Sequence, residues 1–285
     1  MRWWQRIWCF LHNLFFRRDV YKRRARWRVV AASVQGSRHE RLGQPCQDAY
    51  AYEATPSGAL IVAVADGAGS ARYAQQGAQS AVQAVREFLR TTDCLTKGGL
   101  DKWRAIATQA IEAARRAIAE QAQQGEATVS DFATTLIGVV ATPHAVATVQ
   151  IGDGAVVLED AQGQLHLLTH TRLGEYLNET VFITSEGALQ HARFEYWEGE
   201  ATHLAIFTDG LELLALQLPD ATPYPPFFQP LFRFVDSPES SPAQLEAFLR
   251  SERVRARTDD DLTLVLIGRE GRRRACENGA YWQNL

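Results

Sequence analysis

The sequence IVAVADGAGS, residues 61–70, combines a strand pattern with an acidic turn. Its first five residues are all apolar or small, and such a continuous run is typical of a strand that is covered on both faces. The run ends at Asp66, and Gly67 and Gly69 then let the backbone turn sharply and approach a ligand closely. A carboxylate at the end of a buried strand is costly unless it is compensated, and a metal ion is the strongest compensation. Taken alone, the Asp66-Gly67 pair predicts only a turn.

The composition is that of a folded globular protein. Of the 285 residues, 46% are hydrophobic and 22% are charged, which supports a sizeable core and excludes disorder of the whole chain. The length fits one large domain or two small ones. The four cysteines are widely separated and form no metal-ligand spacing, so we interpret them as reduced thiols in a cytoplasmic protein.

Charge is distributed unevenly along the chain. Residues 1–28 contain nine basic residues and one acidic residue, a net charge of +8, whereas the whole chain carries −3, which leaves −11 for the other 257 residues. An acidic main body disfavours nucleic acid as the principal partner.

Residues 1–28 are interpreted as a basic, aromatic, amphipathic N-terminal extension. Apolar side chains recur there at helical spacing, namely Trp3, Ile7, Phe10, Leu11 and Leu14. The longest uncharged run, Ile7–Phe16, is too short to span a bilayer. Two interpretations remain open. The segment either contacts an anionic membrane surface, which would make the protein peripheral at the membrane, or packs against its own body or a partner protein.

The rest of the chain shows alternating strand and helix patterns. Strands are predicted at 27–34, 49–53, 60–65, 133–141, 145–151, 155–160, 164–169, 202–207 and 262–267. Helices are predicted at 74–90, 100–124, 211–216 and 242–250. The short turn before residue 60 predicts an antiparallel hairpin, and the two long helices should pair antiparallel over one face of a sheet.

Three segments lack a regular pattern. Residues 36–48 are polar and are predicted to form a functional loop, and residues 170–200 are predicted to be irregular and to include a flap over a site. Residues 217–243 are rich in proline and phenylalanine, so we expect an ordered loop around a short helix.

Aspartates recur beside predicted strand ends. They are Asp48, Asp66, Asp153, Asp209 and the run Asp259–Asp261. Several carboxylates brought together are tolerable only with cations between them, and a donor set made only of oxygen favours Mg²⁺ or Mn²⁺ over zinc. Two such ions roughly 4 Å apart can hold a bridging hydroxide and a phosphate for in-line phosphoester hydrolysis.

An ordered series of motifs now resembles a known family. The series is Gln47-Asp48, Asp66-Gly67-Ala68-Gly69-Ser70, Ala133-Thr134-Thr135-Leu136, Gly152-Asp153-Gly154, Thr208-Asp209-Gly210 and Asp260-Asp261-Leu262-Thr263. It resembles the motif set of the PP2C (PPM) family of metal-dependent serine/threonine protein phosphatases. The segment 174–180 is similar to the flap of the bacterial branch.

The resemblance implies an α+β fold, a four-layer α/β/β/α sandwich in which two antiparallel sheets are flanked by antiparallel helix pairs. The phosphatase domain would span residues 29–268, between the extension at 1–28 and a basic C-terminal tail at 269–285.

The resemblance also implies roles for individual residues. Asp66 would bridge two metal ions and act directly in catalysis, and Gly67 would supply a backbone carbonyl. Asp209, also catalytic, and Asp260 would complete the first metal site. Asp48 would bind or orient water on the second metal. The remaining carboxylate, Asp153, would join Asp209 in holding a third, weaker ion.

The chain departs from the family pattern at two positions. Gly43 occupies the place of an arginine that grips the phosphate, so Arg38, His39 or Arg41 would have to replace it, with the two arginines as the phosphate-binding candidates. Ala68 stands where some relatives carry a histidine general acid. His39 is therefore the candidate general acid, and the alternative is a solvated loop histidine without a role.

The resulting prediction is a phosphatase of phosphoserine and phosphothreonine in proteins that uses a metal-bridged hydroxide and two Mn²⁺ or Mg²⁺ ions. One alternative is a catalytically weak or inactive regulatory module of the same fold that binds a kinase or phosphoprotein. A two-metal nuclease is disfavoured by the acidic body. A serine/threonine kinase or its target is the natural partner by family analogy.

Overall fold

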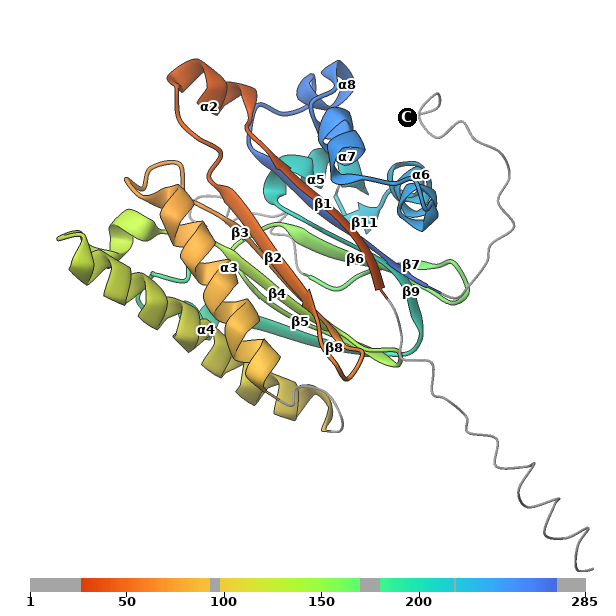
Figure 1. Cartoon of the computed structure of the whole chain (residues 1–285), viewed down its shortest axis with the longest axis horizontal. Coiled ribbons are helices and arrows are strands. Elements are labelled where there is room, and N and C mark those ends of the chain that lie inside the picture. The colour runs from red at the N-terminus through yellow and green to blue at the C-terminus, as the bar shows by residue number, and fades with distance from the viewer. Residues whose placement is uncertain (1–26, 93–97, 170–179, 218, 271–285) are drawn as a thin grey trace, which may run out of the picture.

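The computed structural model describes residues 27–92, 98–169, 180–217 and 219–270. Its frame is two five-stranded antiparallel sheets stacked face to face (Figure 1). The N-terminal extension, apart from Trp27 and Arg28, lies outside the described residues, as do most of the predicted flap and of the C-terminal tail. No helix in the described ranges is long and apolar enough to cross a bilayer.

The first sheet has the order β1-β12-β9-β6-β7. Its strands are Trp27–Val34 (β1), Leu262–Arg269 (β12), Ala201–Phe207 (β9), Ala155–Asp160 (β6) and Leu165–Leu167 (β7). Each strand pairs antiparallel with its neighbours, and a bulge interrupts the β6–β9 register between Glu159 and Asp160. The sheet therefore joins the two ends of the described chain, because β1 lies beside β12.

The second sheet has the order β2-β3-β4-β5-β8. Its strands are Asp48–Ala54 (β2), Leu60–Asp66 (β3), Leu136–Ala141 (β4), Ala145–Ile151 (β5) and Arg193–Glu198 (β8). The predicted β2–β3 hairpin is confirmed. The irregular structure predicted for residues 170–200 is wrong at β8, which forms the edge of this sheet beside β5.

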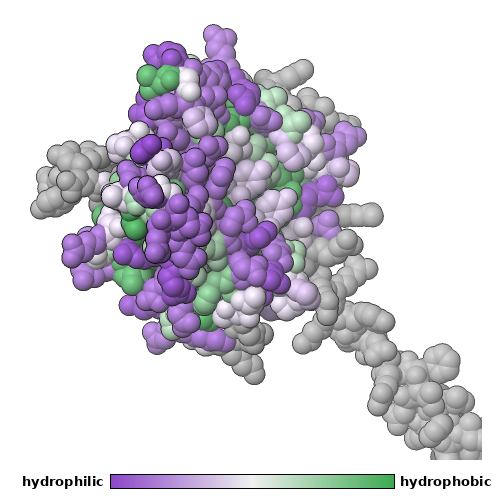
Figure 2. All heavy atoms as spheres, turned by 60° about the vertical axis from the view of Figure 1, so that its left-hand side comes forward, coloured by the Kyte–Doolittle hydropathy of each residue, from purple (hydrophilic) through white to green (hydrophobic). Residues whose placement is uncertain are grey.

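Helices cover the outer face of each sheet, which confirms the four-layer sandwich. The pair α3 (Ala74–Thr91) and α4 (Gly99–Gln124) packs on the second sheet, and α6 (Pro225–Asp236) and α7 (Pro242–Leu249) pack on the first (Figure 1). Viewed from the α3–α4 side, the surface is mainly hydrophilic with small, separate apolar patches (Figure 2). A surface of this kind is typical of helices that bury one face only.

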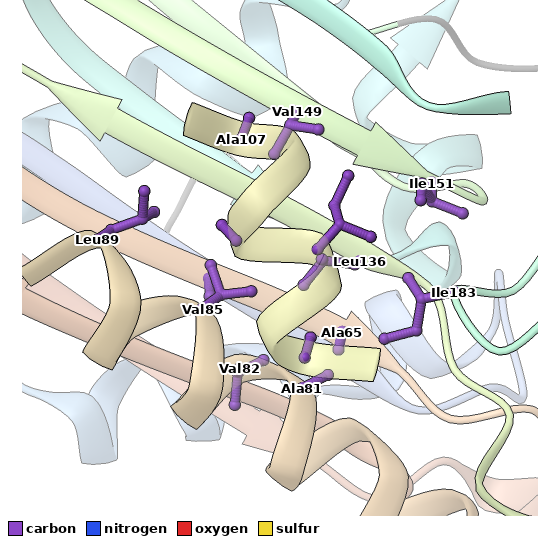
Figure 3. Close-up of a cluster of buried hydrophobic side chains, with 14 of the residues drawn as sticks. Ala65, Ala81, Val82, Val85, Leu89, Ala107, Leu136, Val149, Ile151 and Ile183 are labelled. Atoms are coloured by element: carbon purple, nitrogen blue, oxygen red, sulfur yellow. The ribbon is translucent and has the colours of Figure 1, made fainter. Parts of the chain in front are cut away.

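The strand β3 shows why residues 61–65 are continuously apolar. Successive side chains of a strand point to opposite faces. Accordingly, Ile61, Ala63 and Ala65 join the core beneath α3 and α4, whereas Leu60, Val62 and Val64 join the core between the sheets. Figure 3 shows the first of these cores, where α3 and α4 meet β4 and β5. Burial of each large aliphatic side chain contributes about 1.5–3 kcal/mol, so both faces of β3 stabilise the sandwich.

The proline-rich segment is more regular than predicted. Helix α6 has twelve residues and begins with Pro225 and Pro226, where the amide that proline lacks would have no helical partner. Pro230 lies inside the helix, where it removes one backbone hydrogen bond. Phe228 and Phe232 are fully buried against the first sheet, and their burial offsets that loss.

The polar loop predicted for residues 36–48 contains a short helix, α2 (Ser37–Leu42). It ends at Gly43, whose φ of 65° lies in the left-handed region that favours glycine.

Candidate metal centre

Three of the predicted aspartates meet at one point. Carboxylate oxygens of Asp66, Asp153 and Asp209 lie within 4.8 Å of one another. Asp48 is adjacent, because it begins β2 directly opposite Asp66 at the end of β3. Asp260 also lies near these aspartates, since its charge raises the pKa of Asp66 and of Asp209. The cluster contains carboxylates from five separate segments of the chain.

The cluster lies where the chain passes from one sheet to the other. Asp153 occupies the turn between β5 of the second sheet and β6 of the first. Gly152 and Gly154 flank it with φ of 93° and 85°, backbone values that residues other than glycine rarely adopt. Asp209 follows β9 of the first sheet after Thr208. The carboxylates therefore converge because two sheets are stacked, and neither sheet alone would assemble them.

The backbone around Asp66 is fixed by two threonines. The Thr134 hydroxyl donates to the Asp66 carbonyl at 2.8 Å, and the Asp66 amide donates to the Thr135 hydroxyl at 3.0 Å. A Cβ at Gly67 would lie 2.5 Å from the carbonyl oxygen of Ala74, at the start of α3. Glycine is therefore required at position 67, and the Ala133-Thr134-Thr135-Leu136 motif is explained as the anchor of the Asp66 turn.

The carboxylates are poorly solvated and repel one another. Burial raises the pKa of Asp48 to about 7 and, together with the charges of Asp153 and Asp260, that of Asp209 to about 7. Burial and the neighbouring carboxylates also raise the pKa of Asp66 well above its usual range. A cation among these groups would remove the repulsion and favour their ionised forms.

The donor atoms fit a hard cation. The Thr208 hydroxyl donates to Oδ2 of Asp48 at 2.8 Å, whereas the buried Oδ1 of the same carboxylate has no hydrogen-bond partner among the described residues. Since a buried carboxylate oxygen without a partner is costly, Oδ1 is suited to a metal ion or to its water. Oxygen donors without histidine or cysteine match Mg²⁺ or Mn²⁺.

A further carboxylate, Glu212, belongs to this cluster and was missed from the sequence. It begins α5 (Glu212–Ala215), and its Oε1 accepts a hydrogen bond from the Gly154 amide at 3.0 Å. Burial and the charges of Asp153 and Asp209 raise its pKa to about 7. The available signal was its position three residues after Asp209, because a helical turn brings such residues to the same side.

The two candidate arginines lie in different surroundings. Nη2 of Arg38 lies 3.6 Å from Oδ1 of Asp260, and a Cβ at Gly69 would lie 3.1 Å from the same nitrogen. Arg38 is therefore between the Asp66 turn and a predicted metal ligand. Arg41 instead pairs with Asp259 at 3.3 Å, and both of these side chains are more than half exposed.

The third candidate in this loop, His39, is buried. Its exposed fraction is 3%, so the alternative of a solvated loop histidine is wrong. Its Nδ1 lies 2.9 Å from Oδ2 of Asp261. The Asp261 carboxylate also accepts hydrogen bonds from the backbone amides of Gly36 and Gln47, each at 2.6 Å. Asp261 thus fastens both ends of the loop that carries Arg38 and leads to Asp48, a role that the sequence did not indicate.

Comparisons with known proteins agree with this geometry. Residues 35–250 match the family model described as Protein phosphatase 2C. Serine/threonine-protein phosphatase 3 of Escherichia coli (strain K12) is 38% identical over 250 residues, which is 84% of this chain and 97% of that protein.

Solved structures share the fold at lower identity. The serine/threonine phosphatase of S. agalactiae has a TM-score of 0.61 and 16% identity, covering 85% of this chain and 99% of that one. The catalytic domain of the phosphatase PstP, in complex with two manganese ions, has a TM-score of 0.57 and 18% identity, covering 85% and 98%. With the aspartate cluster in place between two stacked sheets, the chain belongs to the protein phosphatase 2C family of serine/threonine phosphatases.

Proposed function

We propose that residues 29–268 hydrolyse phosphoserine and phosphothreonine in protein substrates at the aspartate cluster, with two Mn²⁺ or Mg²⁺ ions as cofactors. The observation that carries the proposal is the convergence of Asp66, Asp153 and Asp209 within 4.8 Å, beside the buried Asp48. The name of the E. coli relative and the two manganese ions in the PstP structure support it. In an inactive module that binds no metal, nothing would compensate for the energetic cost of holding these carboxylates together.

Each carboxylate has a proposed place in the metal centre. Asp66 would hold both ions, Asp209 and Asp260 would complete the first, and Asp48 would serve the second. Asp153 and Asp209 would hold a third, weaker ion, and Gly67 would supply a backbone carbonyl. When bound, the ions neutralise charge on the phosphate and promote ionisation of the attacking water. Glu212 positions Asp153, because it accepts the amide hydrogen of the next residue, Gly154.

Arg38 is the proposed phosphate ligand, in place of the family's arginine at the Gly43 position. Its guanidinium lies beside the cluster and can donate several hydrogen bonds to a dianionic phosphate. Arg41 shares the loop but is turned toward Asp259. Of the two arginines proposed from the sequence, the geometry therefore favours Arg38.

The general-acid role of His39 stays a prediction. Because Nδ1 is engaged with Asp261, only Nε2 could deliver a proton to the leaving oxygen. A proton donor matters for the alkoxide of serine or threonine but little for p-nitrophenolate, which leaves readily. His39→Gln should therefore slow hydrolysis of a phosphothreonine peptide more than that of p-nitrophenyl phosphate. Equal losses on both substrates would assign His39 a structural role.

The deciding experiment measures hydrolysis of p-nitrophenyl phosphate and of a phosphothreonine peptide with and without Mn²⁺. We expect turnover that depends on the metal and that Asp66→Asn or Asp209→Asn abolishes. Asp259→Asn is the matched control, because this exposed aspartate precedes Asp260 without joining the cluster. Binding of a phosphoprotein without turnover, with every divalent ion tried, would support the inactive module instead.

A second experiment compares the arginines. Arg38→Ala should raise KM for the phosphopeptide and weaken inhibition by inorganic phosphate about 10–100-fold, since a charge-assisted hydrogen bond contributes about 1.5–3 kcal/mol. Arg41→Ala should leave both quantities nearly unchanged. Equal effects of the two substitutions would refute the assignment of Arg38.

The cellular location and the partners of the enzyme are proposed from the sequence. We expect a cytoplasmic protein that acts on targets of a serine/threonine kinase, with residues 1–28 contacting either a membrane surface or a partner protein. Co-sedimentation with anionic liposomes, with and without residues 1–28, tests the membrane alternative. Equal sedimentation of both forms would discard it.

A further inference from the structure

A groove of about 540 Å³ lies on the outer helical layer of the first sheet. It is lined by residues of α5, α6 and α7 and of the short helix α8 (Glu252–Arg255). Its wall includes Leu214, Phe227 and Phe248. Leu213 and Tyr224, two of the six large hydrophobic residues that are exposed in the described ranges, also line it. Apolar side chains thus stand exposed beside polar surface in this groove, which is typical of an interaction site.

The charge of the groove indicates its ligand. Arg253 and Arg257 are exposed in its lining, and the lining contains no acidic residue. Neither arginine forms an ion pair with a residue that the structure describes, whereas the nearby Arg250 and Arg255 are paired with Glu40. In a main body that is otherwise acidic, this arrangement fits an acidic partner. The basic segment 1–28 of the same chain has the wrong charge to occupy it.

The groove is close to the metal centre along the chain. Leu213 directly follows Glu212, and Arg257 precedes Asp260 by three residues. Three residues span at most about 11 Å, so the Cα atoms of Arg257 and Asp260 are no farther apart than this. An extended peptide advances about 3.3 Å per residue. A substrate with its phosphorylated residue at the metal centre could therefore place the residue about three positions away beside Arg257, at the edge of the groove.

We propose that this groove binds the substrate chain about three residues from the phosphorylated side chain and selects segments in which a large apolar residue adjoins Asp or Glu. This inference rests on the proposed phosphatase function. The apolar wall would bury the large side chain, and Arg253 and Arg257 would pair with the carboxylate.

The test uses phosphothreonine peptides that differ only at two adjacent positions. These two positions lie within two to four residues of the phosphothreonine, either before it or after it. One set carries Leu-Asp, a second Leu-Lys and a third Ser-Gly at those positions. We expect Leu-Asp to give the highest kcat/KM, about tenfold above Ser-Gly, when it lies on one side of the phosphothreonine. The double variant Arg253→Glu/Arg257→Glu should reverse the preference between Leu-Asp and Leu-Lys while leaving hydrolysis of p-nitrophenyl phosphate unchanged.

The matched control is Arg116→Glu, an exposed arginine of α4 on the opposite helical layer. It should keep the wild-type preference for Leu-Asp. Equal kcat/KM for all peptides, or the same change of preference in Arg116→Glu, would overturn the proposal. If the wild-type protein does not hydrolyse p-nitrophenyl phosphate at all, the phosphatase function itself is refuted. Fluorescence anisotropy of the unphosphorylated peptides would then still test the groove, since the preference for Leu-Asp should persist in binding.

Discussion

Replacement of Asp261 by asparagine should destabilise the protein strongly, although the side chain keeps its shape. The Asp261 carboxylate is buried, and its Oδ1 accepts from the Gly36 amide. Its Oδ2 accepts from the Gln47 amide and interacts with Nδ1 of His39. Asparagine has one oxygen only. Whichever way its amide turns, the NH2 group faces at least one backbone N–H.

The magnitude follows from the bonds that are lost. A hydrogen bond to a charged acceptor contributes about 1.5–3 kcal/mol, and a buried N–H without a partner costs about 1–3 kcal/mol. We therefore expect Asp261→Asn to lower the free energy of unfolding by about 3 kcal/mol. For a domain of this size, each kcal/mol shifts Tm by about 2–4 °C, so Tm should fall by about 6–12 °C.

Thermal unfolding followed by circular dichroism measures this shift, with Asp259→Asn as the neighbouring control. Among the described residues, Asp259 has one ion pair, to Arg41, and both partners are largely exposed, so its replacement should change Tm by less than about 2 °C. Similar Tm values for the two variants would refute the inference that Asp261 holds both ends of the loop. The experiment also separates two aspartates that are indistinguishable by type and nearly adjacent in sequence.

Three further predictions follow from the burial and charge of particular groups. In the metal-free protein, the free energy of unfolding should fall as pH rises from about 4 to about 7, because the raised pKa values of Asp48 and Asp209 make the folded state bind protons that the unfolded state releases. Urea denaturation with EDTA measures this slope, and saturating Mn²⁺ should abolish it. Burial opposes the charged form of His203, but hydrogen bonds with Asp236 and Glu159 outweigh it and raise its pKa, so its stabilisation is complete below pH 6.5 and is lost as pH rises through the folded-state value. The difference in unfolding free energy between wild type and His203→Gln should therefore shrink from pH 6 to pH 9, and a constant difference would contradict this. Gly67→Ala should lower Tm and weaken Mn²⁺ binding by calorimetry, because its Cβ would strike the Ala74 carbonyl, whereas Gly125→Ala, which has room for a Cβ, should not.

Some features of the fold could be predicted because their signals are local. The apolar run of β3 indicated burial on both faces, and β3 indeed supplies two cores. Helices α3 and α4 were predicted within one residue of their observed ends. By contrast, β8 was missed because it is a half-buried edge strand whose short alternation is weak. Helix α6 was underestimated because its buried phenylalanines, and not its backbone preference, stabilise it.

For the candidate site too, some features could be predicted from the sequence and others could not. The sequence by itself determined that carboxylates follow buried strands at Asp66 and Asp209, since strand patterns and glycine turns are encoded by neighbouring residues. Only the tertiary structure decided that Asp261 fastens the loop, and that Arg38 lies beside Asp260 whereas Arg41 pairs with Asp259. Asp261 and Gly36 are 225 positions apart and meet because β1 pairs with β12 in the first sheet. Their pairing depends on the packing of distant segments, which no local pattern in the chain records.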